Sequence, residues 1–341
     1  MRGRVDRGAD PGDDGRLLAV VAGSLTRDRI LVEGHEAETR IGGAVWYAGR
    51  TLQALGCHLR AVYRRAECDS DLDEALAEAG LTPRPEPAAR TTRFTLRYRG
   101  EPPSRPTYPA PCSAPSPRLD ARLWNSAAHG APRHWPLRGP VSAPLELAEL
   151  AAPERAEPIG AAAVVAAAAG CALLYLGPLH PEDLDASLWP RLPVGGPWIA
   201  LDLQGLCRRV EPSGRIVPAA HASAVQALAV VDVVKANAGE AALLTGAADA
   251  LAAARTLARA CRGGEAVVTL GAEGALAATR ERLWHVPAEP LPPVEATGAG
   301  DTCFAAYLAR RLEGATPEQA LWFAVRYTAR RLAARVGTSS K

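Results

Sequence analysis

The chain has 341 residues, of which 48% are hydrophobic and 22% are charged, and its formal net charge is +2. This length allows one large domain or one domain with an appendage, and the apolar content excludes a largely disordered chain. The near-neutral charge, with arginines scattered along the chain, excludes the basic surface of a nucleic-acid-binding protein. The seven cysteines include no C-x-x-C pair, which indicates reduced, cytoplasmic thiols and neither a disulfide framework nor a zinc site.

The first hundred residues contain two apolar segments and two alternating ones. Residues 1–15 are rich in Gly, Asp and Arg and lack the apolar segment of a signal peptide, so we expect a flexible N-terminal extension. The apolar run 16–23 predicts a buried parallel strand, and the double glycine at the start of 42–55 opens a predicted helix. Alternation of apolar and polar residues predicts an exposed hairpin at 28–41 and a half-exposed strand at 91–98.

Residues 101–158 differ from the rest of the chain. Prolines are frequent there and no helical or strand period holds, which predicts a long loop or insertion, partly disordered. The two alternating segments do not fit a parallel layer, so we expect them to form a small β-sheet lid from about 28–41 and 91–111. The rest of residues 16–341 would form one domain beneath this lid.

After the insertion, strands and helices alternate along the chain. The uncharged stretch 159–179 is long enough to span a membrane, but its alanines, Gly170 and Pro178 favour a helix that turns into a buried strand. Alternation of strand and helix predicts a mostly parallel sheet with helices on both faces. The predicted strands are 172–176, 198–202, 231–235 and 266–270, and the predicted helices are 222–229, 240–244, 248–261, 302–313 and 317–335.

The segment Ala296-Thr297-Gly298-Ala299-Gly300-Asp301-Thr302 runs directly into a predicted helix. A helix start offers unpaired N–H groups and the positive end of the helix dipole, and two glycines let the backbone close around an anion. The N–H groups of Ala299, Gly300 and Asp301 could hold the charge of a transferred phosphoryl group, with Asp301 as an ionised, weak base. Alternatively, Asp301 only complements the helix dipole and the glycines form a turn.

Two other segments place polar residues after predicted strands. Thr269, Gly271 and Gly274 follow one strand, and Asn237 and Glu240 follow another. The carboxyl ends of parallel strands bind ligands in open α/β sheets, but a glycine turn and an asparagine N-cap are also common structural features. The absence of a G-x-x-x-x-G-K-[ST] loop excludes a P-loop nucleotide site, and the absence of G-x-G-x-x-G after the first strand counts against a nicotinamide enzyme.

Taken together, these segments resemble a known family. The motifs are Gly23-Ser24 with Asp28, Gly42-Gly43, Asn237-x-x-Glu240, Thr269-x-Gly271-x-x-Gly274 and Thr297-Gly298-Ala299-Gly300-Asp301. In order and spacing, over residues 17–337 apart from the insertion, they resemble the ribokinase (PfkB) family of carbohydrate kinases. The resemblance implies a ribokinase-like three-layer αβα sandwich with a mostly parallel central sheet and a small β-sheet lid, and ATP-dependent phosphorylation of an alcohol.

The same resemblance implies roles in catalysis and donor binding. Asp301 would be the base, and Gly298, Ala299 and Gly300 would form the anion hole. Asn237 and Glu240 would organise the phosphates and Mg²⁺, with Glu240 acting on the metal through water. The residues along the nucleotide would be Thr269, Gly271 and Gly274.

The residues that would hold the hydroxyls of the substrate are Asp28, Gly42 and Gly43. The Asp28 carboxylate has two oxygens that accept hydrogen bonds, which suits two neighbouring hydroxyls of a vicinal diol. Tyr47 stands where many sugar kinases of the family have an asparagine, which puts the usual furanose contacts in doubt and makes Tyr47 a candidate substrate contact. Glu295 stands where many relatives have an aspartate that helps to bind a monovalent cation, so potassium activation is left open.

Three segments resemble a narrower branch, the myo-inositol kinase-like members. They are Leu201 to Arg208, Glu240 with Leu244-Thr245-Gly246, and Gly300 to Cys303. Arg208 follows a predicted strand and would contact phosphate or substrate; a solvated arginine in a surface turn is the alternative. This resemblance favours a cyclitol over a ribofuranoside.

The sequence therefore predicts a cytoplasmic, ATP-dependent kinase, with Mg²⁺ as cofactor, that phosphorylates a small polyol of the inositol type. A nucleoside or sugar kinase of the same fold is one alternative, and a catalytically weak metabolite-binding or assembly protein is another. We expect a small-molecule substrate and neither a nucleic-acid nor a membrane partner. The sequence leaves open a homodimer that pairs through the β-lid.

Overall fold

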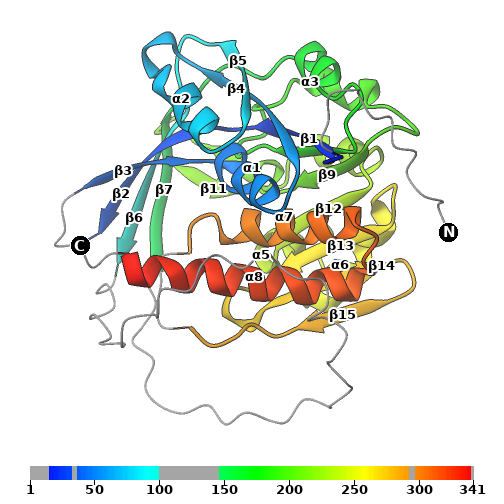
Figure 1. The fold of residues 1–341 in the computed structure, drawn as a ribbon. Helices are drawn as coiled ribbons and strands as arrows, with labels where there is room; N and C mark the ends of the chain where they lie inside the picture. The colour runs from blue at the N-terminus through cyan, green and yellow to red at the C-terminus, as the bar shows by residue number, and fades with distance from the viewer. Residues whose placement is uncertain (1–14, 33–36, 100–145, 292–295, 339–341) are drawn as a thin grey trace.

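A nine-stranded sheet forms the centre of the computed structural model, which describes residues 15–32, 37–99, 146–291 and 296–338 (Figure 1). Its strand order is β15-β14-β13-β12-β9-β8-β1-β4-β5. The pairs from β13 to β5 are parallel, and β14 and β15 extend the β13 edge in antiparallel fashion. The bounds are β1 Leu18–Gly23, β4 His58–Arg65, β5 Thr82–Pro87, β8 Leu173–Gly177, β9 Trp198–Asp202, β12 Val233–Asn237, β13 Glu265–Thr269, β14 Ala275–Thr279 and β15 Leu283–Val286.

Helices cover both faces of the sheet, which confirms the predicted three-layer sandwich. Apolar residues of the buried strands alternate between two cores, so that Val20 belongs to one and Val21 to the other. One core lies under α1 Ala44–Ala54, α2 Asp71–Glu78, α7 Ala299–Leu312 and α8 Pro317–Thr338. The other lies under α3 Ala161–Ala167, α4 Ser223–Leu228, α5 Ala238–Thr245 and α6 Ala250–Ala260.

A separate four-stranded sheet forms the predicted lid. Its strand order is β3-β2-β6-β7, with β2 Thr26–Val32, β3 Glu38–Gly42, β6 Arg93–Arg99 and β7 Glu146–Glu154. The prediction that 101–158 is irregular throughout is wrong at β7, because this strand pairs with β6 and completes the lid. Most of the predicted extension 1–15, the tip of the first hairpin and residues 100–145 lie outside the described residues.

The sequence patterns missed several elements of the first half. β5 reads Thr-Pro-Arg-Pro-Glu-Pro, a composition that argues against a strand. It nevertheless pairs in parallel with β4 at the edge of the sheet. Its prolines occupy every second position, so the missing N–H donors can all lie on the unpaired side of an edge strand. Among the described residues, no single helix is long and apolar enough to cross a membrane, although the bent pair α5 and α6 would meet that criterion together.

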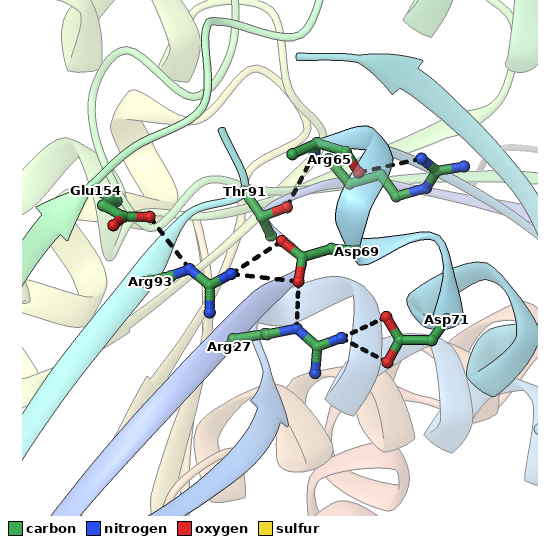
Figure 2. Close-up of polar contacts among 8 residues, drawn as sticks. Arg27, Arg65, Asp69, Asp71, Thr91, Arg93 and Glu154 are labelled. Atoms are coloured by element: carbon green, nitrogen blue, oxygen red, sulfur yellow. Dashed lines mark hydrogen bonds and ion pairs between the residues drawn. The ribbon is translucent and has the colours of Figure 1, made fainter. Parts of the chain in front are cut away.

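One buried carboxylate joins the lid to the body of the protein (Figure 2). Asp69 is 5% exposed and accepts hydrogen bonds from Arg27 Nε at 2.7 Å and Arg93 Nη2 at 3.1 Å. Arg27 and Arg93 are register partners on β2 and β6, the inner strands of the lid. Arg27 also pairs with Asp71, and Arg93 Nε lies 3.1 Å from Glu154 Oε2 on β7. This network attaches the base of the lid to the segment between β4 and α2.

We expect Asp69→Asn to lower the free energy of unfolding by about 1–3 kcal/mol, because two partly buried guanidinium groups lose a shared counter-charge. Asp71→Asn is the matched control, since its side chain is 59% exposed and exposed ion pairs contribute roughly 1 kcal/mol or less. Urea unfolding followed by tryptophan fluorescence measures both. Equal losses in the two variants would contradict the special role of the buried carboxylate.

Candidate active site

The predicted ligand-binding segments meet at the carboxyl ends of the parallel strands. β1 leads into lid strand β2, β8 ends at Gly177 and β9 ends at Asp202. Asn237 at the end of β12 is the register partner of Thr269 at the end of β13. Open α/β sheets bind their ligands at this edge.

The start of α7 provides unpaired backbone donors. Gly298 is the N-cap residue with φ 76° and ψ 4°, a left-handed conformation that favours glycine. The N–H groups of Gly300 and Asp301 donate to no acceptor in the described part of the chain. The N–H of Ala299 donates to Ala296 O at 2.9 Å. The prediction that Ala299 donates to an anion is therefore wrong for this structure, because the tight turn uses that N–H. The candidate anion hole is left with the N–H groups of Gly300 and Asp301.

Tyr47 lies against this anion hole. A Cβ atom added to Gly298 would lie 2.3 Å from Tyr47 Cγ, so the ring covers the glycine directly. Its neighbour Trp46 faces the Arg50 guanidinium, with 4.6 Å between the Arg50 Cζ and the ring centroid. Tyr47 thus packs on the turn that forms the anion hole, and Trp46 is occupied by a protein contact.

The Asp301 carboxylate lies buried beside the anion hole. Asp301 is 9% exposed, and Tyr175 Oη donates a hydrogen bond to its Oδ1 at 3.2 Å. Burial and the negative charge of Asp202 raise the pKa of Asp301 to about 7, although Lys235 and Tyr175 favour the charged form. The expectation of a fully ionised, weak base is therefore wrong, because the cost of burying the charged carboxylate exceeds the stabilisation that the helix start gives it. A carboxyl group with a pKa near neutrality is well suited to accept a proton.

A buried ion pair lies beneath the anion hole. Lys235 Nζ donates to Asp202 Oδ2 at 2.9 Å, and the two side chains are 4% and 2% exposed. A Cβ atom on Gly300 would lie 3.0 Å from Lys235 Nζ. Burial alone would lower the pKa of Lys235, but the charges of Asp202, Glu240 and Asp301 raise it, so the ammonium group stays protonated. Sequence reasoning assigned no role to this pair or to Tyr175, although a lysine inside the apolar strand Val-Val-Lys-Ala-Asn was an available signal.

Asn237 and Glu240 form a capping box at the start of α5. Glu240 N donates to Asn237 Oδ1 and Asn237 N donates to Glu240 Oε2, both at 2.8 Å. The structural use of the asparagine is therefore present. Within the described residues Glu240 Oε1 accepts no hydrogen bond, which leaves one carboxylate oxygen for a water-bound cation.

The predicted nucleotide segment is a tight turn after β13. Thr269 ends the strand half-buried, Gly271 begins the short 3-10 helix η5 (Gly271–Glu273), and Gly274 follows it. Leu270 N donates to Gly274 O at 2.8 Å and closes the turn. The two predicted donor-binding segments thus lie side by side at the ends of neighbouring strands.

The predicted acceptor residues also lie together. Asp28 is 6% exposed and accepts a hydrogen bond from Thr26 Oγ1 at 2.7 Å. A Cβ atom on Gly42 would lie 1.9 Å from Asp28 Oδ2, so only glycine allows this close approach, and Gly43 is the N-cap of α1. The lid therefore delivers a buried carboxylate to the start of the first helix.

Arg208 begins the strand β10 (Arg208–Val210), which pairs with β11 (Ile216–Pro218). Its Nη1 donates to Leu179 O at 3.1 Å. Burial lowers the pKa of Arg208 although the charges of Glu240, Asp202 and others nearby act against this. The alternative of a solvated surface arginine is wrong, because the side chain is half-buried and its guanidinium donates a hydrogen bond to a backbone carbonyl near the site.

The lid contacts the anion-hole segment directly. Tyr98, near the end of β6, has its hydroxyl 3.0 Å from Thr297 Oγ1, and Thr297 precedes Gly298. Both side chains are partly buried. This hydrogen bond therefore links the position of the lid to the conformation of the segment before Gly298.

Residues 210–340 match the model of the pfkB family carbohydrate kinases. No curated protein matches the chain. A pyrophosphate-dependent kinase in the ribokinase family, complexed with a pyrophosphate analog and myo-inositol, is 19% identical with a TM-score of 0.72; the alignment covers 92% of this chain and 95% of that one.

Two further solved structures share the fold. Thermotoga maritima ribokinase is 16% identical with a TM-score of 0.57, over 93% of each chain. Burkholderia thailandensis nucleoside kinase in complex with inosine is 15% identical with a TM-score of 0.63, over 92% of this chain and 90% of that one. The predicted resemblance is confirmed for the fold: the chain has the ribokinase-like fold, and residues 210–340 match the pfkB family model. The family match supports a phosphotransferase.

The site geometry predicts how turnover depends on pH. Because Asp301 must be deprotonated to act as a base, kcat/KM should rise with pH through an apparent pKa near 7. Asp202→Asn removes a negative charge, so the pKa of Asp301 falls and the acidic limb moves to lower pH. Tyr175→Phe removes a hydrogen bond to the charged form, so the limb moves to higher pH.

Phosphate transfer measured across the neutral range tests these opposite shifts. Tyr307→Phe is the matched control, because it removes a buried hydroxyl whose 2.6 Å hydrogen bond is to Glu265 and not to Asp301. A limb that stays at the same pH in the Asp202 and Tyr175 variants would contradict the assignment to Asp301.

The lid contact predicts a change in backbone exchange. Tyr98→Phe should increase amide hydrogen exchange over residues 296–302, because the turn loses its link to the lid. Tyr327→Phe, on α8 with its ring stacked on Phe323, should leave that segment unchanged. Hydrogen exchange followed by mass spectrometry measures both. Unaltered protection in Tyr98→Phe would show that the turn is ordered without the lid.

Proposed function

We propose that the chain is an ATP-dependent phosphotransferase that phosphorylates a hydroxyl of a small polyol, most specifically an inositol-type cyclitol. One observation carries this proposal: the N–H groups of Gly300 and Asp301, which have no acceptor among the described residues, lie beside a buried Asp301 carboxylate whose pKa is raised to about 7. Such a site combines stabilisation of a transferred anion with a proton acceptor. A helix start with a structural role only would have no need of a desolvated carboxylate.

The reaction follows from the positions of these groups. The acceptor hydroxyl oxygen forms a bond to the γ-phosphorus of ATP, the bond from that phosphorus to the ADP oxygen breaks, and Asp301 takes the hydroxyl proton. The N–H groups of Gly300 and Asp301 bind the transferred oxygens, and the Lys235 ammonium below adds positive charge. Closure of the lid excludes water, which limits transfer of the phosphoryl group to water.

Mg²⁺, when bound, neutralises charge on the donor phosphates. The described residues include no group of three or more His, Cys, Asp or Glu side chains that could hold a metal. Mg²⁺ commonly binds one or two carboxylates together with waters and substrate phosphates. Glu240 fits this pattern as a contact through water, whereas Glu295, the residue relevant to a monovalent cation, lies outside the described residues.

The acceptor assignment depends on Asp28 and on the resemblance to inositol kinases. A buried carboxylate can accept hydrogen bonds from two neighbouring hydroxyls, which favours vicinal diols. The similar fold of a kinase complexed with myo-inositol supports this choice. That protein is described as pyrophosphate-dependent, so pyrophosphate is the competing donor, while the turn at Thr269–Gly274 is the basis for preferring ATP.

We also propose a cytoplasmic location. The six cysteines that the structure describes are all free thiols. A homodimer through the lid would use β3, the edge strand of that sheet, and Glu38, Thr39 and Arg40 on this strand are exposed.

The decisive experiment combines a donor panel with an acceptor panel. ATP and pyrophosphate are each incubated with Mg²⁺ and inositols, inositol monophosphates, aminocyclitols, hexoses, pentoses or nucleosides, and phosphate esters are detected by ³¹P NMR. We expect ATP with a cyclitol to react fastest, and Asp301→Asn to lower the rate by roughly 10²- to 10⁴-fold. Asp249→Asn, which alters the carboxylate that caps α6, is the matched control and should keep full activity.

Each other outcome contradicts one part of the proposal. Full activity of Asp301→Asn contradicts the assigned base. Transfer from pyrophosphate but not from ATP contradicts the donor. Acceptor binding without any transfer supports the alternative of a metabolite-binding protein.

A further inference from the structure

A polar cavity lies next to the candidate active site. Its volume is about 280 Å³, and it opens between the end of β8, the β10–β11 hairpin and the segment that follows β7 of the lid. The charged and polar side chains that line it are Arg155, His180, Glu182, Arg208, Arg209 and His221. Three guanidinium groups therefore share the cavity with one carboxylate.

The Glu182 carboxylate pairs with Arg155 and balances its positive charge. Arg155 Nη1 lies 3.2 Å from Glu182 Oε2 and 2.9 Å from His180 Nε2. Burial lowers the pKa of His180, so the imidazole adds no charge near neutral pH. The remaining positive charge of the cavity belongs to Arg208 and Arg209.

Arg208 has no ion-pair partner within the described residues. Its Nη1 donates to Leu179 O at 3.1 Å, which uses one of five guanidinium donors. The carboxylates of Glu240, Asp202, Asp183 and Asp301 act on this half-buried guanidinium from a distance, but none forms an ion pair with it. An anion that enters the cavity would therefore bond to guanidinium donors that no described carboxylate uses. Arg209 is exposed beside it and supplies a second cation at the cavity wall.

The cavity lies at the strands that join the acceptor side of the sheet to the donor side. The donor-binding segments follow β12 and β13, whereas the cavity residues follow β8 and β9, and β8 lies beside β1, which leads to Asp28. The apolar face of the lid, with Phe94 and Leu96, packs against Leu179 and Ile216 at the same end of the sheet. Of the carboxylates whose charges act on Arg208, Glu240 on the donor side has the largest effect, and Asp301 at the reacting centre also contributes.

We propose that this cavity binds an anionic substituent of the acceptor, a carboxylate or a phosphate, with Arg208 and Arg209 as its counter-charges. The proposal rests on the proposed function and narrows the acceptor to a polyol that already carries a negative charge. The hydroxyl to be phosphorylated would lie at Asp301, and the anionic group would lie at Arg208. Paired guanidinium contacts to carboxylate or phosphate are among the strong polar interactions of proteins.

Binding without a donor tests the cavity independently of turnover. Isothermal titration at constant ionic strength compares inorganic phosphate, myo-inositol 1-phosphate and neutral myo-inositol. We expect the phosphorylated cyclitol to bind more tightly than the neutral one, and Arg209→Gln to weaken phosphate binding roughly tenfold. Arg215→Gln is the matched control, since Arg215 is an exposed arginine of the same hairpin region outside the cavity.

Steady-state kinetics then show whether the bound anion belongs to the acceptor or to the phosphoryl donor. Arg209→Gln should lower kcat/KM for an anionic acceptor roughly tenfold and leave a neutral acceptor unchanged. Phosphate binding that is unaffected in the Arg208→Gln/Arg209→Gln double variant would overturn the proposal. Displacement of bound phosphate by ATP or pyrophosphate but not by myo-inositol 1-phosphate would also overturn it, because the cavity would then serve the donor. If no acceptor is phosphorylated, the proposed function is wrong. The titration still shows whether the cavity binds an anion.

Discussion

Three charges, those of Asp202, Lys235 and Asp301, share one buried region beneath the start of α7, and the chemistry of the site depends on their balance. Lys235 neutralises Asp202 at 2.9 Å, so Asp301 is left as an extra negative charge in a poorly hydrated environment. The carboxylate therefore holds its proton more strongly than an exposed aspartate would. The same lysine lies under Gly300, so the cation that stabilises Asp202 also supports the binding of an anion above it.

The lid is connected to this charged centre at two levels. At its base, Asp69 binds an arginine from each inner lid strand, which fixes the direction in which β2 and β6 leave the body (Figure 2). Near its far end, Tyr98 reaches Thr297 at the turn before α7. The lid is thus anchored at one end and hydrogen-bonded at the other to the turn before α7. A movement of the lid would therefore change the position of this turn. This arrangement suits a transfer reaction from which water must be excluded.

Much of the architecture was predictable because local patterns were strong. The apolar strand Trp198–Asp202 has the predicted bounds, and the glycine-rich segment 298–300 opens a helix as expected. β5 and β7 were missed for a physical reason: three prolines argue against β5, and β7 lies within a proline-rich region without a clear period. Both strands form because a neighbouring strand offers them an edge, which is a property of the assembled sheet and not of their own residues.

The sequence by itself determined the order of the motifs and hence the kind of site, since residues that follow parallel strands must meet at one edge of the sheet. Only the tertiary structure decided which groups are free to act. It used the Ala299 N–H in a turn, placed Tyr47 on Gly298, left Arg208 half-buried and raised the pKa of Asp301 to about 7. These outcomes depend on burial and on charges brought together from β8, β9 and β12, and no local pattern contains that information because desolvation and Coulomb interactions act through space.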